Sequence, residues 1–219
     1  MRKIDEIYNS MLGKNGGYTG FCDYIESDGN GQYIDTGLKG YNDTTFKFHY
    51  LQCVNTTEAG IFGAYNYNNG GATTANELCA YFSLQHMYYG KGNGWTNAIT
   101  AIFPNNKQYT LDVIWQGGNA TKFILTNIDT DEVLEPTMNR VLTETSMTLL
   151  LFAVNEATTG SVIYNVNSLK MGRVERHDNN VLTQDFRPYV DNDIAGMLDV
   201  VNDVFYPSAN GVNFLYGNF

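Results

Sequence analysis

The sequence predicts an all-β fold, and three observations lead to that class. Short segments that alternate apolar and polar residues follow one another along most of the chain, as half-buried strands do. Clusters rich in Gly and Asn separate these segments, and such clusters are typical of turns that need a positive φ. No helical periodicity occurs between the segments, so the pattern favours a β-sandwich or barrel over alternating strands and helices.

The composition agrees with one large β domain. The chain has 219 residues, of which 43% are hydrophobic and 14% aromatic, enough for one sizeable core. Its net charge of −10 repels phosphate backbones, so we expect no nucleic-acid partner. No apolar stretch is as long as a membrane span, and the N-terminus lacks the apolar region of a signal peptide. We therefore expect no membrane partner.

Three cysteines, Cys22, Cys53 and Cys79, occur without a CxxC or Cys/His spacing. An odd number of cysteines without metal-ligand spacing argues against a disulfide framework and against a zinc site. We expect three buried, reduced thiols, which pack as small hydrophobic side chains.

Residues 2–12, within an N-terminal anchor segment over 1–17, carry the clearest helical pattern. Four apolar residues of this segment share one face of the predicted helix: Ile4, Ile7, Tyr8 and Met11. Gly13 and the glycines that follow it end the pattern. A helix this short is marginal alone, so its apolar face needs a partner. It packs either on its own domain or, as an anchor, on a neighbouring subunit of an assembly.

From residue 18 to residue 219 we expect one sandwich domain. Two short alternating pieces around a Gly- and Asn-rich turn open it over 23–37, and a half-buried strand follows over 44–52, with Phe46, Phe48 and Tyr50 alternating against Lys47, His49 and Leu51. Further strands are expected at 61–65, 79–84, 108–115, 122–127, 147–154 and 161–174. The aromatic tail over 181–219 is expected to wrap the sandwich.

Two stretches resemble a known family. The first is YIESDGNGQYIDTG at 24–37. The second comprises MGRVE at 171–175, VLTQDFRPY at 181–189, GMLD at 196–199, NDVFY at 202–206 and FLYG at 214–217. Together they are similar to the concanavalin A-like (laminin G-like) jelly-roll domains of tailed-phage virion proteins and some bacterial surface proteins.

The resemblance implies a two-sheet antiparallel jelly-roll sandwich in which an opening hairpin over 24–37 starts the domain. The chain departs from the family pattern by an additional Gly31, by Arg187 where an apolar residue is usual, and by Leu198 in place of Tyr. The matching motifs have structural explanations: glycines permit tight turns, Pro188 ends its strand, and Phe186 is expected to fill the sandwich edge. The motifs support the fold, and fold does not imply function.

A search for catalytic groups along single strands finds none. Hydrolases of this fold carry carboxylates that alternate along one strand. The nearest candidate is DTDEVLE over 129–135, in which DTDE reads as a turn between the 122–127 strand and Val133-Leu134. His49 is expected to be exposed, His86 lies in an aromatic run, and His177 falls in a polar loop over 175–180. None has the partner residues of a nucleophilic triad. We therefore expect a protein that is not an enzyme.

Cofactor binding is not expected. The segments Asp28–Gly31 and Asp191–Asp193 offer oxygen atoms of the kind that Ca²⁺ prefers. The resemblance to laminin G-like domains would allow a single Ca²⁺ at the sandwich rim. Asx turns explain both segments without a metal.

One loop has the composition of a glycan site. Its residues Tyr88, Tyr89, Asn93 and Trp95 combine aromatic faces, which cover sugar rings, with a hydrogen-bonding amide. Aromatic residues are also favoured at protein–protein interfaces and in the core. Contact with a glycan, contact with a protein and internal packing all stay open for this loop.

Three alternative functions are considered from these observations. The resemblance implies a structural virion component, such as a capsid-decoration, head-fibre or tail-associated protein, made in the host cytoplasm and joined to other virion proteins in an oligomeric assembly. An alternative is a carbohydrate-binding module or adhesin on a bacterial cell surface. Host or mucosal glycans are partners in either case. The third, a glycoside hydrolase, lacks the carboxylate pattern along a strand.

Overall fold

The structure is a computed structural model that describes residues 18–39, 43–53, 58–65, 77–83, 86–89, 98–99, 106–115, 121–135, 137–138, 147–156, 161–163 and 168–219. These residues form strands and turns without a helix, and the strands build two sheets, so the prediction of an all-β two-sheet sandwich is confirmed. The helix expected over 2–12, with Ile4, Ile7, Tyr8 and Met11, lies outside the described residues, as does the rest of the anchor segment over 1–17. Within the described ranges no helix could cross a membrane.

The strands, in chain order, are short except for β4 and β18. Their bounds are β1 (Gly20–Phe21), β2 (Tyr24–Asp28), β3 (Ile34–Lys39), β4 (Thr44–Cys53), β5 (Glu58–Tyr65), β6 (Glu77–Ser83), β7 (His86–Tyr89), β8 (Ala98–Ile99), β9 (Gln108–Trp115), β10 (Thr121–Asn127), β11 (Val133–Leu134), β12 (Thr137–Met138), β13 (Thr148–Leu151), β14 (Val154–Glu156), β15 (Ser161–Ile163), β16 (Ser168–Met171), β17 (Val174–Asp178), β18 (Val181–Asp191), β19 (Ile194–Asp199), β20 (Val204–Pro207) and β21 (Leu215–Gly217).

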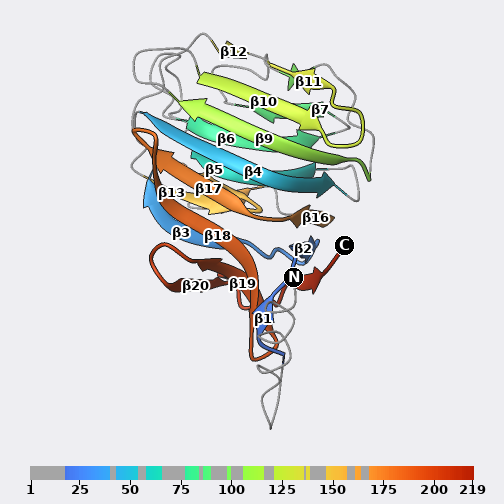
Figure 1. Cartoon of the computed structure of the whole chain (residues 1–219), viewed down its shortest axis with the longest axis vertical. Helices are drawn as coiled ribbons and strands as arrows, with labels where there is room; N and C mark the ends of the chain where they lie inside the picture. Colours follow the sequence, from blue (N-terminus) through green and yellow to red (C-terminus); the bar gives the residue numbers. More distant parts are fainter. Residues whose placement is uncertain are drawn as a thin grey trace, which may run out of the picture.

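The large sheet runs in the order β11-β10-β9-β4-β17-β18-β19-β20. Strand β1 pairs with β18, and β12 with β10, while β16 joins β4 to β2, which in turn pairs with β21. All of these pairings are antiparallel. The central strands β9, β4 and β17 are therefore neighbours although they are far apart in the sequence, and they lie in front of the second sheet in Figure 1.

The second sheet runs in the order β15-β14-β5-β6-β7-β8, with β13 pairing with both β3 and β5. Strands β14 and β5 pair in parallel, and the other pairs of this sheet are antiparallel. Phe152, between β13 and β14, has a φ of 65°. This left-handed residue divides the strand that was expected to run without a break over 147–154.

The core lies between the two sheets. Phe46 and Phe48 of the large sheet meet Phe62 of the second sheet, with ring centroids 5.4 and 5.0 Å apart. Such tilted aromatic pairs bury large apolar areas in each contact. Phe123 and Leu111 of the large sheet are also fully buried. One face of the large sheet thus supplies the core, and its other face is free to carry polar side chains.

The opening hairpin predicted over 24–37 is not formed. Strand β2 pairs with β16 and β21 in the large sheet, whereas β3 pairs with β13 in the second sheet. The connecting turn is closed by Gln32, which is fully buried and donates from Nε2 to Asp28 Oδ1 at 2.6 Å and to the carbonyl of Asn213 at 3.0 Å. The turn therefore carries the chain from one sheet to the other.

The tail over 181–219 does not wrap the sandwich but supplies strands β18–β21 of the large sheet. Pro188 does not end its strand, because β18 continues to Asp191. Pro188 lies between Phe186, where pairing with β17 ends, and Tyr189, where pairing with β1 begins. Its carbonyl accepts the N–H of Cys22 at 3.2 Å at the end of the pairing with β1, and a proline can donate no N–H in return. Phe186 is buried in the core, as expected.

The first and last described strands lie at the same end of the domain. Tyr18 donates its backbone N–H to Asp193 Oδ1 at 2.7 Å, and the N–H of Asp193 reaches the carbonyl of Tyr18 at 3.0 Å. The ring of Tyr18 stacks on Tyr216, with centroids 6.0 Å apart. These contacts fix the point at which residues 1–17 join the sandwich.

Candidate functional site

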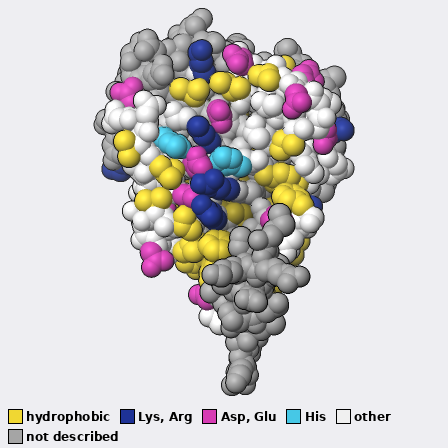
Figure 2. Space-filling view, viewed as in Figure 1, with side chains coloured by type: hydrophobic (Ala, Val, Ile, Leu, Met, Phe, Trp, Pro, Cys, Tyr) yellow, Lys and Arg dark blue, Asp and Glu magenta, His cyan; other side chains and the backbone are white. Residues whose placement is uncertain are grey.

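A row of charged side chains crosses the outer face of the large sheet. The register pairs Asp185 of β18 with Glu175 of β17, Glu175 with Lys47 of β4, and Lys47 with Asp112 of β9. Directly paired residues of antiparallel strands project to the same face. Four adjacent strands therefore each contribute one charged residue to a single line, which we call the charged row. Figure 2 shows charged and His side chains gathered over the middle of this face.

A second line of side chains lies beside the charged row, displaced from it by two residues along each strand. Arg187 follows two residues after Asp185, Arg173 precedes Glu175 by two residues, and the N–H of His49 donates to the carbonyl of Arg173 at 2.9 Å. A period of two residues keeps these side chains on the same face as the charged row. His177 continues the face on the other side of Glu175. These four residues and the charged row together form what we call the ionic face.

Asp185 is a buried carboxylate of the ionic face, with a side chain only 3% exposed. Arg173 donates to its two oxygens at 2.6 Å from Nε and 2.9 Å from Nη2, and Arg187 donates to Oδ2 at 3.0 Å from Nε and 2.8 Å from Nη2. Burial alone would raise the pKa of Asp185, but the hydrogen bonds and charges of the two arginines lower it below its ordinary value. The carboxylate is therefore held ionised.

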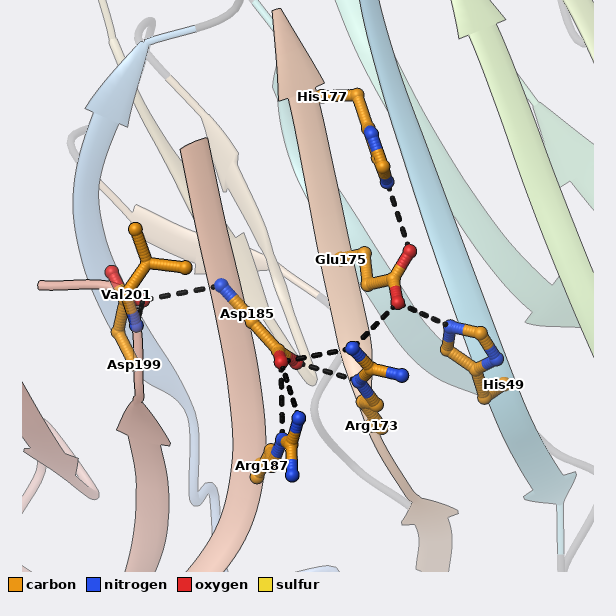
Figure 3. Close-up of polar contacts among 8 residues, drawn as sticks. All are labelled: His49, Arg173, Glu175, His177, Asp185, Arg187, Asp199 and Val201. Atoms are coloured by element: carbon orange, nitrogen blue, oxygen red, sulfur yellow. Dashed lines mark hydrogen bonds and ion pairs between the residues drawn. The ribbon is translucent and has the colours of Figure 1, made fainter. Parts of the chain in front are cut away.

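Glu175 lies at the centre of the ionic face and is also covered, at 13% exposed. Its Oε1 lies 2.7 Å from Arg173 Nη2 and 3.3 Å from His49 Nε2, and its Oε2 lies 2.9 Å from His177 Nε2. Figure 3 shows the carboxylate between the two imidazoles and the guanidinium. Burial would raise the pKa of Glu175, but the hydrogen bond from His177 and the charges of Arg173 and both histidines lower it.

The negative and the positive side chains of the ionic face lie at different depths. Two of its carboxylates are covered, while the side chains of Arg173, Arg187 and His49 are 36%, 44% and 44% exposed. The contacts of Arg187 with Asp185 use two of the five N–H donors of a guanidinium. Although the protein carries a net charge of −10, the surface of this patch presents hydrogen-bond donors and positive charge.

Asp112 ends the charged row on β9 and differs from the other carboxylates. Its burial raises its pKa above the ordinary value, Lys47 and His49 act in the opposite direction, and Glu175 adds to the rise. No ion pair within 4 Å compensates its carboxylate among the described side chains. The ionic face therefore contains one carboxyl group with a raised pKa, Asp112, and two with lowered pKa values, Glu175 and Asp185. In such a set the first can donate a proton while the others stay charged.

The residues expected to bind a glycan are not brought to this face by any described contact. Tyr88 and Tyr89 belong to β7 of the second sheet, and their side chains are not described. Asn93 and Trp95 lie outside the described residues. The proposed glycan loop and the ionic face thus belong to different parts of the chain.

The two segments considered for Ca²⁺ form turns. Asp28 Oδ1 accepts the N–H of Asn30 at 3.0 Å, which makes an Asx turn. Asn192 and Asp193 have φ values of 49° and 65° and close the β18–β19 hairpin as a two-residue turn. Among the side chains that the structure describes, no group of three or more His, Cys, Asp or Glu could hold a metal ion.

The expectations for histidine and cysteine are partly corrected. His49 is exposed, as expected. His177 lies in strand β17 rather than in a loop, which is why its side chain reaches Glu175. Cys22 is buried, but Cys53 is only half-buried. Desolvation by burial, with a smaller contribution from Asp23, raises the pKa of the Cys22 thiol to about 12.

Sequence reasoning overlooked most of the ionic face because it searched along single strands. A signal was nevertheless present: Arg173, Glu175 and His177 alternate, as do Asp185 and Arg187. Alternating charges of this kind indicate one polar face of a strand. Arg187 was noted only as a departure from the family pattern, and the structure shows that it pairs with Asp185.

No family model matches the chain, and no curated protein matches its sequence. Solved structures do match its fold. Scytalido-glutamic peptidase with a peptide-based transition-state analogue aligns over 91% of this chain and 100% of that chain, with 9% identity and a TM-score of 0.44. The eqolisin-family peptidase SCP-B, in complex with the tripeptide Ala-Ile-His, aligns over 91% and 100%, with 10% identity and a TM-score of 0.41.

A phage protein also matches. Tailspike protein 2 of Escherichia coli O157:H7 bacteriophage CAB120 aligns over 77% of this chain but 27% of its own length, with 12% identity and a TM-score of 0.39. Likenesses at this level concern the arrangement of strands and transfer no activity.

The expectation that this protein is not an enzyme is wrong as it was drawn. Peptidases of the glutamic, or eqolisin, kind are among the matched structures. The failed search along single strands could not exclude catalysis either, because the ionic face brings ionisable groups together across strands.

Proposed function

We propose that this chain is a structural component of a tailed-phage particle, of the capsid-decoration, head-fibre or tail-associated kind, and that its ionic face binds a carboxylate-bearing glycan of the host or of a mucosal surface. The concanavalin A-like jelly-roll topology is part of the same proposal. The resemblance of the motifs at 24–37 and 171–217 supports the virion role. The layered charge of the ionic face supports the acidic ligand.

The ligand proposal depends on one observation: the carboxylates of the ionic face are covered, whereas its arginines are exposed. Asp185 and Glu175 are covered, so they hold the arginines in place without exposing negative charge to a ligand. The Arg187 guanidinium is 44% exposed, and the planar fork of such a group matches a carboxylate better than a neutral hydroxyl group. Because Asp185 fixes both guanidinium groups before a ligand arrives, little side-chain entropy is lost on binding.

Direct binding measurements test the ligand class. The full chain would be titrated with oligosaccharides that contain uronic acids and with the same oligosaccharides after reduction of the carboxyl groups to alcohols. We expect binding of at least one acidic oligosaccharide and a loss of about tenfold or more after reduction, since a hydrogen bond to a charged group contributes about 1.5–3 kcal/mol. Equal binding of both forms, or of neither, contradicts an acidic ligand.

A matched pair of variants locates the binding surface. Arg187→Gln removes one outward guanidinium but leaves Arg173 on Asp185, and it should weaken binding about tenfold. Lys39→Gln removes one positive charge from an exposed position on β3, in the second sheet. If both variants weaken binding equally, the effect reflects net charge and not the ionic face.

The virion role is tested separately. Mass spectrometry of particles purified by density gradient should detect the chain, and removal of residues 1–13 should leave a folded sandwich that no longer joins the particle. Absence of the full chain from purified particles would favour the alternative, an adhesin of a bacterial cell surface. A shortened chain that still joins the particle would show that Ile4, Ile7, Tyr8 and Met11 are not the anchor.

A further inference from the structure

We infer that an aromatic surface beside the ionic face, formed by Phe21, Tyr189 and Phe205, binds the sugar ring whose carboxylate lies against Arg187. The inference rests on the proposed function for its ligand class, a glycan with carboxylate groups. It adds a second set of contacts, with the apolar C–H groups of the sugar ring, and it restricts the ligand to uronic acids in the pyranose form.

The register of strands β18 and β19 places Tyr189 on the same face as Arg187. The pairing of the two strands is unbroken from Phe186 to Asp191. Phe186 and Val190 both belong to the core, and successive side chains of a strand point to opposite faces. Arg187 and Tyr189 therefore project to the outer face of the sheet.

Two further rings extend this face on either side of Tyr189. Phe21 of β1 pairs directly with Tyr189, and the two rings meet edge to face with centroids 5.1 Å apart. Phe205 of β20 meets Tyr189 in the same way from the other side, with centroids 6.0 Å apart. Phe21 is 39% exposed and the other two rings are half-buried, so solvent reaches all three. The three rings form one continuous aromatic surface.

Gly196 makes room for this arrangement. It is the residue of β19 that pairs with Tyr189, and a Cβ at this position would lie 2.9 Å from two ring atoms of Phe205. The ring of Phe205 therefore occupies the place that a side chain on β19 would take, and it reaches Tyr189 across that strand. Because the rings hold one another before a ligand arrives, little side-chain entropy is lost on binding.

The aromatic surface adjoins Arg187. Tyr189 follows Arg187 by two residues on the same strand, a separation of about 6.4–6.8 Å at the usual rise of a strand. Leu198 connects the two kinds of side chain, since it pairs with Arg187 on one side and with Phe205 on the other. Figure 2 shows hydrophobic side chains directly below the basic ones on this face. A guanidinium and aromatic rings thus lie within reach of one sugar unit.

These neighbours select a ligand that uses both chemistries. The guanidinium of Arg187 binds a carboxylate, while the apolar body of a tyrosine covers C–H groups and its hydroxyl can bond a sugar hydroxyl. Among the described residues no hydrogen bond engages the hydroxyl of Tyr189. A neutral sugar would leave Arg187 unused, and a peptide of glutamates would leave the rings unused. A pyranose uronic acid contacts both.

The experiment titrates the full chain with four ligands that each carry four carboxylates. Three are uronic acid oligosaccharides: tetragalacturonate, an alginate tetrasaccharide and a hyaluronate octasaccharide. The fourth is a tetraglutamate peptide with blocked ends, which measures the contribution of charge alone. We expect at least one oligosaccharide to bind about tenfold or more tightly than the peptide. Ring protons of the bound sugar should shift upfield in NMR spectra, because the face of an aromatic ring shields nuclei above it.

Variants locate the sugar ring. Tyr189→Ala removes the central ring and should weaken binding about tenfold, as truncation of an aromatic anchor commonly does. Phe21→Ala, at the rim, should weaken it about threefold. Tyr189→Phe keeps the ring and should bind within about threefold of the wild type. The control, Ile128→Ala, removes an apolar side chain of similar exposure, 41%, after β10 and near the opposite edge of the sheet. It should bind as the wild type does.

The outcomes separate the two proposals. If none of the oligosaccharides binds, the proposed function and the inference fail together. If tetraglutamate binds as tightly as the oligosaccharides, the ionic face binds acidic groups without reading a sugar ring, which favours an acidic protein partner and overturns the inference. Wild-type binding by Phe21→Ala and Tyr189→Ala, or the absence of an upfield shift, overturns it as well. Should Tyr189→Ala not fold, Phe21→Ala and the upfield shift decide.

Discussion

Arg173 and Asp185 form a two-pronged ion pair in which Nε donates to Oδ1 at 2.6 Å and Nη2 donates to Oδ2 at 2.9 Å. The same guanidinium reaches Glu175 at 2.7 Å. One arginine thus connects the two covered carboxylates of the ionic face. Because a covered carboxylate without partners is costly, this pair holds neighbouring strands β17 and β18 in one arrangement.

Removal of this arginine should destabilise the fold more than removal of Arg187. Arg173→Gln removes the shared guanidinium from both carboxylates and leaves Asp185 with Arg187 and Glu175 with the two histidines, so we expect unfolding to become easier by about 1–3 kcal/mol. Arg187→Gln leaves Asp185 bonded to Arg173 and should have a smaller effect. Urea denaturation measures both, with Lys39→Gln as the control, expected within about 0.5 kcal/mol of the wild type. Equal effects of the two arginine variants would contradict the bridging role of Arg173.

Acid should destabilise the protein through Asp185 and Glu175. Their pKa values are lowered in the folded state, so their contribution to stability is complete above the unfolded pKa values, about 4, and is lost as pH falls through the lower folded values. Denaturation of the wild type between pH 7 and pH 2 should show this loss. Asp185→Asn should start less stable at pH 7 and lose less stability below about pH 4. Parallel curves would exclude Asp185 as a source of the acid sensitivity.

Asp112 should behave in the opposite way. Its pKa is raised, so ionisation of this carboxyl opposes folding at neutral pH, and the opposition disappears as pH falls through the folded pKa. Asp112→Asn should therefore be as stable as the wild type or more stable at pH 7, by up to about 1 kcal/mol, with the difference shrinking in acid. Thermal melts at several pH values measure it. A variant that is clearly less stable at pH 7 would show that Asp112 is held in a favourable ion pair.

Cys22 should resist alkylation in the folded protein. Its side chain is 8% exposed and its pKa is raised to about 12 by burial and by the charge of Asp23, and the thiolate is the reactive form. In a variant in which Cys53 and Cys79 are replaced by serine, iodoacetamide at pH 8 should label Cys22 about 100-fold or more slowly in the folded state than in urea. Similar rates would show that Cys22 is accessible.

Gly196 should tolerate no side chain. A Cβ at this position would overlap the carbonyl oxygen of Tyr206 and lie 2.9 Å from two ring atoms of Phe205. Gly196→Ala should destabilise the β19–β20 pair by about 1–3 kcal/mol, as overpacking does. Gly37 has a φ of 66° but nothing within 4 Å of its Cβ position, so Gly37→Asn should lose less than about 1 kcal/mol. Calorimetry of both variants distinguishes steric overlap from backbone strain.

Strand β4 shows how far alternation predicts the fold. The sequence correctly placed Phe46, Phe48 and Tyr50 inside and Lys47 outside. It failed at Leu51, which was assigned to the polar face but is fully buried. The register with β9 shifts between Phe48 and Leu51, and an irregularity of this kind changes the phase of the alternation. Leu51 therefore joins the core, while Tyr50 is covered by Tyr24 and Phe219. Alternation is a local property, whereas the irregularity depends on the partner strand.

The strand at 108–115 was predicted with its observed bounds, and the turn over 129–132 was also correct, since Leu134 pairs with Leu125 in the β10–β11 hairpin. The strand expected over 161–174 was divided into three. These outcomes share one cause. Local sequence determines where a chain can extend or turn, but a strand is broken where its partner changes, as between β16, which pairs with β2 and β4, and β17, which pairs with β4 and β18.

The sequence by itself determined the all-β class, the two faces of β4 and the exposure of His49, because each depends on alternation within a few residues. Only the tertiary structure decided which strands are neighbours. It placed β4 between β9 and β17, and so brought Asp112, Lys47, Glu175 and Asp185 into one row. Pairing between distant strands depends on contacts across the whole chain, and no spacing along one strand encodes it. The ionic face exists because of that pairing.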